Sequence, residues 1–205
     1  MARKTKAEAA ATREALLDAA EEVFFAKGVA RTSLEQIARH AGLTRGAVYW
    51  HFKNKGDLFK ALVQRVRMPF QSLMEEVNNA DPTVSPLEAI RLACLAGLNR
   101  LEQPSHQRIL SILLHRCEFF SDINPIEMQD EIAEECFDEM LAVFQLAQQQ
   151  QLLREDISPE VATRLIQSTL GGLFHDWLRN PDAFSLHTRG GELIDAVITL
   201  LHRQR

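Results

Sequence analysis

The sequence predicts an all-α protein of about nine helices, with a three-helix head over residues 1–54 and a larger helical domain over residues 55–205. Apolar residues recur at helical spacing along nearly the whole chain. Capping residues stand at the breaks between these segments, and no alternation of Val, Ile and Thr is long enough for a sheet. Since hydrophobic residues make up 46% and charged residues 25%, the helices can enclose a core of ordinary globular composition.

The head opens with a helix over about residues 7–27, in which apolar residues follow the i, i+3, i+4, i+7 pattern. Gly28 comes directly after it and is a natural stop for a helix. Thr32 is expected to cap the second helix, and Glu35, three residues later, completes a capping box.

Residues 33–53 read as two short helices joined by a tight turn. Ala38 is small where the helices cross, Gly42 can adopt the positive φ of the turn, and Val48 points back into the core. Thr44 is placed to cap the second helix. This spacing indicates a helix-turn-helix over about residues 33–52, a motif that lays its second helix in the major groove of DNA.

The residues left on the outer face of that second helix are Thr44, Arg45, Gly46, Tyr49, Trp50 and His51. Arg45 can donate to guanine edges or a phosphate, Gly46 allows close approach, and Tyr49 and Trp50 offer apolar contacts. Tyr49 can also donate to a phosphate. Contacts to the DNA backbone are expected from His51, Lys55 and the amides near Thr32 and Ser33.

The alternative is that Tyr49, Trp50 and Phe52 are core aromatics of a helical bundle. Neighbouring positions on one helix cannot all face one core, so at least one of Tyr49 and Trp50 must be exposed.

Charge is divided unevenly along the chain. Residues 1–67 carry 13 Lys and Arg against 7 Asp and Glu, a net +6, whereas residues 68–205 carry 10 against 21, a net −11. A basic head on an acidic body suits a protein that offers one end to a polyanion, although chance segregation is the simpler alternative.

The larger domain begins with a fourth helix at Asn54–Asp57, which Pro69 kinks or ends. The clearest linker is 78–86. Further helices are expected at 87–101, 105–120, 126–153, 159–179 and about 188–202. The helix at 105–120 is apolar nearly all round and should therefore be central.

The last two of these helices suit a dimer interface. One face of the first carries Ala162, Leu165, Thr169, Leu173 and Trp177, and the final helix is apolar on a broad side. Gly171 and Gly172 would permit close approach of helices, so two helices from each chain can form a four-helix interface. Burial within the monomer is the alternative.

Several other classes of protein are disfavoured by the sequence. Three scattered cysteines do not make a disulfide framework and suit a reducing cytoplasmic compartment. No apolar run reaches the length of a membrane span, and no signal peptide, phosphate-binding loop or nucleophile elbow occurs. His115, Cys117 and Glu118 do not share one helical face, so no metal site is expected. Since no catalytic constellation occurs, no enzyme activity and no cofactor are expected either.

The run from Thr44 to Lys55, with Gly28-Val29 and the segment from Thr32 to Ala38 before it, resembles the DNA-binding head of the TetR family of bacterial repressors. The segments Ala2–Lys6 and His115–Phe119 resemble the AcrR-like branch, which represses multidrug efflux pumps. The resemblance implies an all-helical homodimer whose head binds double-stranded operator DNA. It also implies a C-terminal ligand pocket whose occupation releases the DNA.

From its residues alone, the body can hold either a solid core or a cavity for apolar ligands, and the resemblance favours a pocket. The candidate lining is Leu110, Leu114, Glu118, Phe137, Met140, Leu141, Ile166, Leu170 and Phe174. Leu110 and Leu114 stand where relatives can have polar residues, and Gly171 where they can have an acidic one. A pocket here is therefore expected to be more apolar, and no particular set of drugs carries over.

The leading interpretation is a DNA-binding repressor of a multidrug efflux operon that apolar or aromatic small molecules release from its operator. The alternative is a constitutive DNA-binding dimer without a ligand pocket. A helical enzyme or lipid carrier with an incidental helix-turn-helix is a third possibility, but no catalytic constellation supports it.

Overall fold

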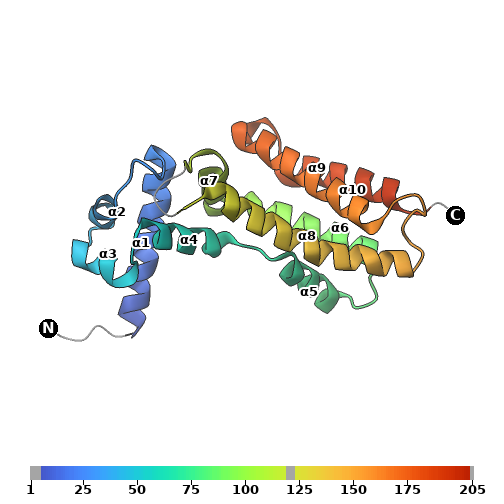
Figure 1. Ribbon diagram of the computed structural model, residues 1–205, viewed down its shortest axis with the longest axis horizontal. Coiled ribbons are helices and arrows are strands. Elements are labelled where there is room, and N and C mark those ends of the chain that lie inside the picture. Colours follow the sequence, from blue (N-terminus) through green and yellow to red (C-terminus); the bar gives the residue numbers. More distant parts are fainter. Residues whose placement is uncertain (1–5, 119–122, 204–205) are drawn as a thin grey trace. The chain divides into compact units, whose positions relative to one another are not determined.

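The computed structural model describes residues 6–118 and 123–203, and these residues confirm the all-α prediction (Figure 1). They form ten α-helices and one 3₁₀ turn, and their only bridge of β type is the isolated pair Leu153–His202. The tenth helix arises at Pro69, which ends the predicted fourth helix and leaves a separate one after it. Met1–Thr5 and Phe119, which carry part of the resemblance, lie outside the described residues.

The chain divides into two compact units, unit 1 of residues 1–67 and 105–128 and unit 2 of residues 68–104 and 129–205. Unit 1 holds α1 (Lys6–Lys27), α2 (Leu34–His40), α3 (Arg45–His51), α4 (Lys55–Val66) and nearly all of α7 (Pro104–His115). Unit 2 holds α5 (Phe70–Ala80), α6 (Pro86–Leu101), α9 (Pro159–Arg179), η1 (Pro181–Ala183) and α10 (Leu186–Leu201). Helix α8 (Pro125–Gln149) begins in unit 1 and continues in unit 2.

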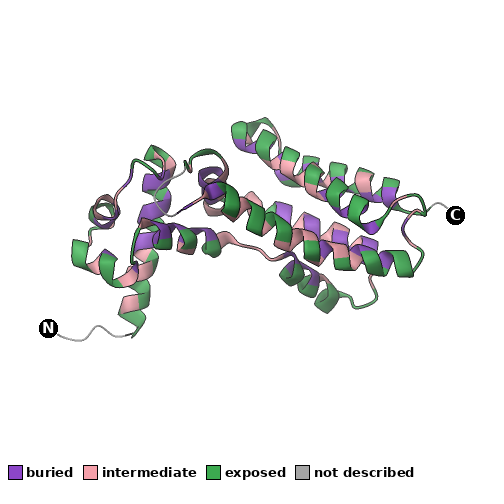
Figure 2. Cartoon of the chain, in the orientation of Figure 1, coloured by how far each residue is buried: buried purple, intermediate pink, exposed green. Residues whose placement is uncertain are grey.

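Helix α1 is the centre of unit 1, because α2, α3 and α4 all pack against it. Its residues Leu16, Ala20 and Phe24 have no exposed surface, and Phe24 meets the ring of Phe59 on α4 edge-on. The burial pattern in Figure 2 follows this arrangement, with buried positions along the inner sides of these helices. The helical periodicity of the sequence therefore marks the packed face of α1.

Unit 1 is larger than the predicted head. Glu21 of α1 is buried, and its carboxylate accepts from the Ser105 hydroxyl at 2.7 Å and from Arg108 Nε at 2.6 Å, both on α7. The Val29 amide donates to the Arg116 carbonyl at 3.3 Å. The packing units thus do not divide at residue 54, because α4 and α7 are both tied to α1; the functional division at 54 stays a prediction.

The bounds of α7 differ from those expected. It ends at His115 rather than near residue 120, and the chain beyond it lies along the end of α1. The Arg116 guanidinium donates to the Phe25 carbonyl at 2.7 Å and stands 4.5 Å from the centre of the Phe25 ring. Contacts to a distant segment therefore fix residues that the apolar periodicity assigns to a longer helix.

Unit 2 is a helical layer in which α10 packs against α6 and α9, and α5 packs against α6. Gly190 of α10 is buried there, and a methyl group on it would lie 2.7 Å from Leu98 and 2.9 Å from Leu173. Arg91 of α6 pairs with Asp195 of α10 at 2.6 Å. Close helix approach and one cross-helix ion pair therefore align these elements.

Candidate DNA interface and ligand domain

The turn between α2 and α3 is built as the sequence predicts in most respects. Gly42 has φ +68°, and the Leu43 amide donates back to the Ala38 carbonyl at 2.8 Å. Thr44 caps α3 by accepting from the Ala47 amide at 3.2 Å. Val48 is fully buried. The position of α3 is therefore set from one side by its core residue and from its start by its cap.

The cap of α2 is Ser33, not Thr32 as predicted. The Ser33 hydroxyl accepts from the Gln36 amide at 3.2 Å, and the Gln36 side chain accepts from the Ser33 amide at 2.9 Å. Thr32 is 3% exposed, and its hydroxyl donates to the Gly28 carbonyl at 2.9 Å. The capping box is thus one residue later than predicted, because Thr32 is used to close the α1–α2 loop.

The outward side of α3 is open to solvent. Trp50 is 72% exposed, Tyr49 is 45% exposed, and the Arg45 side chain is 74% exposed. Thr44 and Gly46 are also exposed, and His51 is half-buried with its ring edge-on to Trp50. Tyr49 and Trp50 are therefore outside the core, and the alternative that they are core aromatics is wrong for these two residues.

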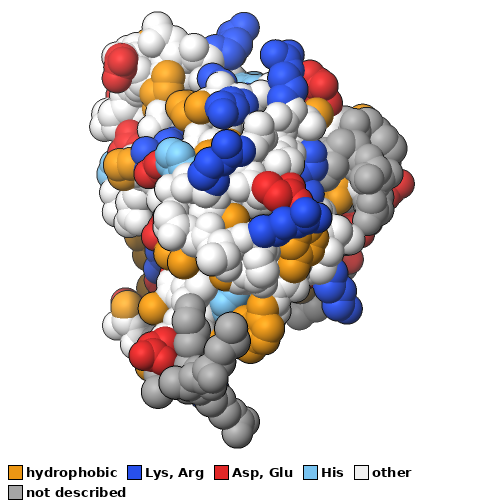
Figure 3. Space-filling model, turned by 90° about the vertical axis from the view of Figure 1, so that its left-hand side faces the viewer, with side chains coloured by type: hydrophobic (Ala, Val, Ile, Leu, Met, Phe, Trp, Pro, Cys, Tyr) orange, Lys and Arg blue, Asp and Glu red, His pale blue; other side chains and the backbone are white. Residues whose placement is uncertain are grey.

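Figure 3 shows the side of the molecule on which α2 and α3 lie. Lys and Arg side chains gather on this face, with apolar side chains between them and fewer acidic ones. Exposed apolar rings among cations are suited to the phosphates, sugars and base edges of a duplex.

Lys55 is half-buried at the start of α4. Its amine donates to the carbonyls of Val29 at 2.8 Å and Ala30 at 3.1 Å, so it holds the α1–α2 loop from the start of α4. Burial lowers the pKa of the Lys55 amine, opposed by the nearby Cys117. Thr32 and Lys55 are thus placed as supports of the helix-turn-helix rather than as side chains that face outward.

Sequence reasoning missed one residue of this surface, Glu35. Its Oε1 accepts from the Tyr49 hydroxyl at 2.9 Å and pairs with Arg45 Nε at 3.2 Å. The backbone amide at the start of α2 and the Tyr49 hydroxyl hold the pKa of this carboxyl below its usual value. The pairing joins α2 to α3, and no spacing within either helix signals it.

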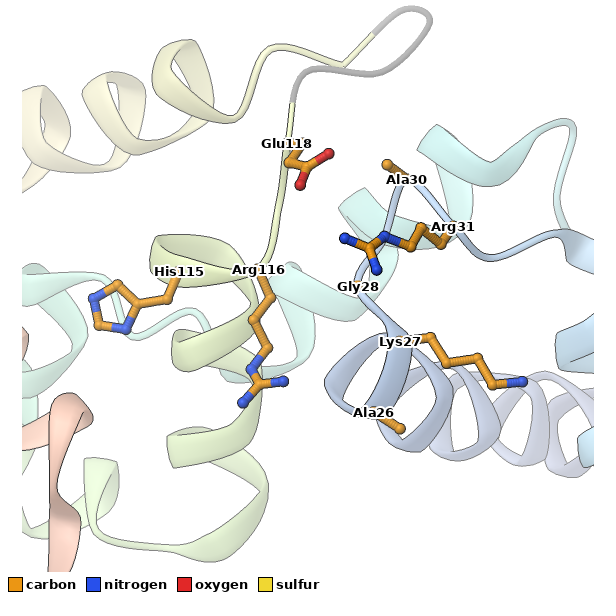
Figure 4. Close-up of a pocket in the computed structure, with 8 residues that line it drawn as sticks. All are labelled: Ala26, Lys27, Gly28, Ala30, Arg31, His115, Arg116 and Glu118. Carbon is orange, nitrogen blue, oxygen red and sulfur yellow. The ribbon is translucent and has the colours of Figure 1, made fainter.

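Unit 1 also has a shallow hollow of about 270 Å³ at the end of α1 (Figure 4). It is lined by Ala26, Lys27, Gly28, Ala30, Arg31, His115, Arg116 and Glu118. In Figure 4, Arg31 reaches toward the segment that carries Glu118, whereas Lys27 and His115 point to opposite sides. Glu118 is exposed here, so the structure places this predicted ligand residue at the surface of unit 1.

The other candidate ligand residues fall into two groups. Leu110 and Leu114 are half-buried on α7 in unit 1. Unit 2 holds Phe137, Met140, Leu141, Ile166, Leu170 and Phe174. Met140 and Ile166 have no exposed surface, whereas the other four are half-buried. The Arg164 guanidinium of α9 lies 4.1 Å from the centre of the Phe137 ring on α8, so an ordered contact joins these two helices.

The apolar stripe predicted on α9 is partly core. Ala162, Leu173 and Trp177 are buried within unit 2, whereas Leu165 is 44% exposed. The large apolar side chains still exposed on α9 and α10 are Val161, Leu165, Leu193 and Leu200. Methyl groups on Gly171 or Gly172 would meet nothing within 4 Å. These two helices thus each have one apolar side inside the protomer and one outside it.

Comparison with known proteins agrees with this architecture. Residues 16–62 match the family model described as bacterial regulatory proteins of the tetR family, and residues 85–203 match that of the MAATS-type transcriptional repressor C-terminal region. The chain is 33% identical over 201 residues to the HTH-type transcriptional repressor BepR of Brucella suis, covering 97% of this chain and 96% of the relative.

Two solved structures have the same fold along nearly their whole length. One is NalD of Pseudomonas aeruginosa, described as the secondary repressor of the MexAB-OprM multidrug efflux pump, with 38% identity, TM-score 0.84 and coverage of 98% of this chain and 100% of that one. The other is the SmeT–triclosan complex, with 33% identity, TM-score 0.81 and coverage of 95% and 93%. No helix among the residues of this chain that the structure describes is long and apolar enough to cross a membrane. The chain belongs to the TetR family of bacterial transcriptional regulators.

Proposed function

We propose that this protein represses a multidrug efflux operon, binding operator DNA as a homodimer and leaving it when an apolar small molecule binds. The observation that carries the DNA-binding part is the open side of α3, where Arg45, Tyr49 and Trp50 are exposed while Val48 is fixed in the core. The descriptions of NalD and SmeT as repressors of efflux pumps support the choice of operon.

The proposed contacts to DNA come from α3 and from the start of α2. They are Ser33, Thr44, Arg45, Gly46, Tyr49, Trp50 and His51. Arg45 reaches base edges, Tyr49 and Trp50 contact sugars or thymine methyl groups, and the others contact phosphates. Thr32 and Lys55 act indirectly by holding the α1–α2 loop.

The DNA test uses a duplex selected from a random pool by the full-length protein, with affinity measured by fluorescence anisotropy. Arg45→Ala and Tyr49→Ala are expected to weaken binding about 5- to 150-fold each, since a good base contact is worth about 1–3 kcal/mol, with little change in thermal stability. Val48→Ala is the matched control, because its main effect should be on thermal stability rather than on a contact to DNA. Equal losses of stability in all three variants would contradict a reading role, and failure of the wild type to select any duplex would refute DNA binding.

The proposed ligand site lies in the C-terminal domain and involves Phe137, Met140, Leu141, Ile166, Leu170 and Phe174, all of unit 2. Phe and Met side chains suit apolar ligands of varied shape. A ligand weakens DNA binding only if it prefers the state that cannot bind DNA. Triclosan is the first ligand to test, because it is bound in the SmeT complex.

Titration calorimetry with triclosan and gel shift of the selected duplex test this site together. Phe174→Ala is expected to lower triclosan affinity without changing DNA affinity, whereas Leu146→Ala, at an exposed position of α8, should change neither. Unchanged DNA affinity over a panel of saturating apolar ligands would favour the constitutive DNA-binding dimer instead.

The proposed dimer interface is the outer apolar side of α9 and α10, centred on Leu165 and Leu200. Such a dimer presents two heads to successive turns of DNA, about 34–36 Å apart. Leu200→Glu should shift the protein to monomers in analytical ultracentrifugation, whereas Leu146→Glu should not. An unchanged dimer in the Leu165→Glu, Leu200→Glu double variant would place the interface elsewhere. A cytoplasmic location goes with this role.

A further inference from the structure

An acidic side chain lies on the surface proposed to face DNA. Glu35 accepts from the Tyr49 hydroxyl at 2.9 Å and pairs with Arg45 Nε at 3.2 Å, and both contacts are made by the same oxygen, Oε1. The carboxylate is 38% exposed, beside an Arg45 side chain that is 74% exposed. Two of the three side chains proposed to read bases are thus held by one anion.

By its charge alone, the Glu35 carboxylate lowers the affinity of this surface for DNA. Duplex DNA carries a negative charge about every 1.7 Å along its axis, so a carboxylate near it is repelled. The Glu35 carboxylate is charged at neutral pH, and the hydrogen bonds that lower its pKa favour this charged form further. Apart from its bond to the backbone amide at the start of α2, any benefit of Glu35 to DNA recognition must therefore come from what it does to Arg45 and Tyr49.

The effect on Tyr49 follows from its single hydroxyl hydrogen, which is donated to Glu35. Tyr49 therefore has no free proton for a phosphate, and what it presents is an aromatic ring that is partly exposed. The Arg45 guanidinium lies 5.5 Å from the centre of that ring, so the two side chains are ordered together.

The effect on Arg45 follows from which nitrogen is used. Glu35 pairs with Nε, which leaves both terminal amino groups for the two acceptors of a guanine edge. A guanidinium anchored in this way has less freedom to follow phosphates. Binding to DNA without regard to sequence depends on phosphate contacts. Such binding is weakened because Arg45 is less available to phosphates and because the Glu35 carboxylate repels them.

We infer that Glu35 is a specificity-determining residue, which weakens binding to arbitrary DNA more than binding to the operator. The inference rests on the proposed reading role of α3. An exposed ion pair changes an equilibrium by about threefold, and the effects of the two pairs in a dimer multiply, so the change in the specificity ratio is expected to be roughly tenfold.

The test measures affinity for the selected duplex and for a scrambled duplex of the same composition, at several salt concentrations. Glu35→Gln keeps an acceptor for Tyr49 and removes the charge. We expect about tenfold tighter binding to the scrambled duplex, less than threefold change on the selected duplex, and a salt dependence on the scrambled duplex that is steeper by about one or two ions. Tyr49→Phe should leave affinity for the selected duplex within about threefold, because the ring is kept.

Glu22→Gln is the control for net charge. Glu22 is on α1 in the same unit and pairs with His40 of α2, not with α3, at 2.6 Å. If Glu35→Gln and Glu22→Gln tighten both duplexes by the same factor, Glu35 acts only through net charge and the inference is overturned. A joint loss of thermal stability and of both affinities in Glu35→Gln would also overturn it, by making Glu35 a structural residue. If the wild type binds no duplex, the proposed function itself fails, which is a separate result.

Discussion

The buried carboxylate of Glu21 predicts that the two partners of one ion pair differ in how much stability is lost when each is replaced. The side chain of Glu21 is 4% exposed, whereas that of its partner Arg108 is 43% exposed. Removal of Arg108 leaves a carboxylate inside unit 1 that keeps the Ser105 hydroxyl at one oxygen and a coulombic interaction with Arg65. Removal of the Glu21 charge leaves a guanidinium that water already reaches. Arg108→Met should therefore cost more stability than Glu21→Gln.

The magnitudes follow from this exposure. Breaking a fully buried ion pair costs about 3–5 kcal/mol. The remaining bond to Ser105 and the half-exposed position of Arg108 reduce this, so we expect about 2–3 kcal/mol for Arg108→Met. Glu21→Gln keeps an amide that can still bond both partners, and should cost about 1–1.5 kcal/mol, the difference between a charged and a neutral hydrogen bond.

Urea unfolding at a fixed protein concentration measures these costs, because the proposed dimer would make stability depend on concentration. The variant with both Glu21→Met and Arg108→Met is the decisive comparison. It should be more stable than Arg108→Met alone, since no charge is left buried. The reasoning would be refuted if the double variant lost as much stability as its two single substitutions added together. A smaller loss of stability in Arg108→Met than in Glu21→Gln would also refute it.

Three further predictions concern packing, support and thiol reactivity. In urea unfolding, Gly190→Ala should destabilise the protein by about 1–3 kcal/mol, because its methyl would meet leucines on two sides; Gly171→Ala should gain about 0.5–1 kcal/mol, and a loss there would reveal a close neighbour in the dimer. Lys55→Met should lower stability by about 1–2 kcal/mol as two carbonyls lose a donor, and a loss of DNA affinity alone would make Lys55 a DNA contact. Burial raises the pKa of Cys94 to about 12 and that of Cys117 to about 11. Since the thiolate is the species that reacts, iodoacetamide at pH 8 should label Cys117 about 100-fold more slowly in the native protein than in the unfolded chain. Rapid labelling of Cys117 in the native protein at pH 8 would contradict that environment.

Local sequence determined which segments are helical and much of how they begin and end. Caps at Thr44 and Asn54 and stops at Gly28 and Gly42 act within a few residues, so they can be found without knowing the fold. The exposure of Tyr49 and Trp50 was constrained by the geometry of one helix. The motif of residues 33–53 was also enough to indicate the family, since its residues are fixed by one short-range arrangement.

The tertiary structure decided what covers each apolar or charged side. Glu35 meets α3, Glu21 meets α7, and Lys55 turns into the α1–α2 loop, and in each pair the partners come from different elements. The spacing along α9 put Trp177 and Leu165 on one stripe, but only packing against neighbours separated the buried residue from the exposed one. Periodicity states which residues share a face of a helix, whereas the neighbour of that face depends on how distant segments pack.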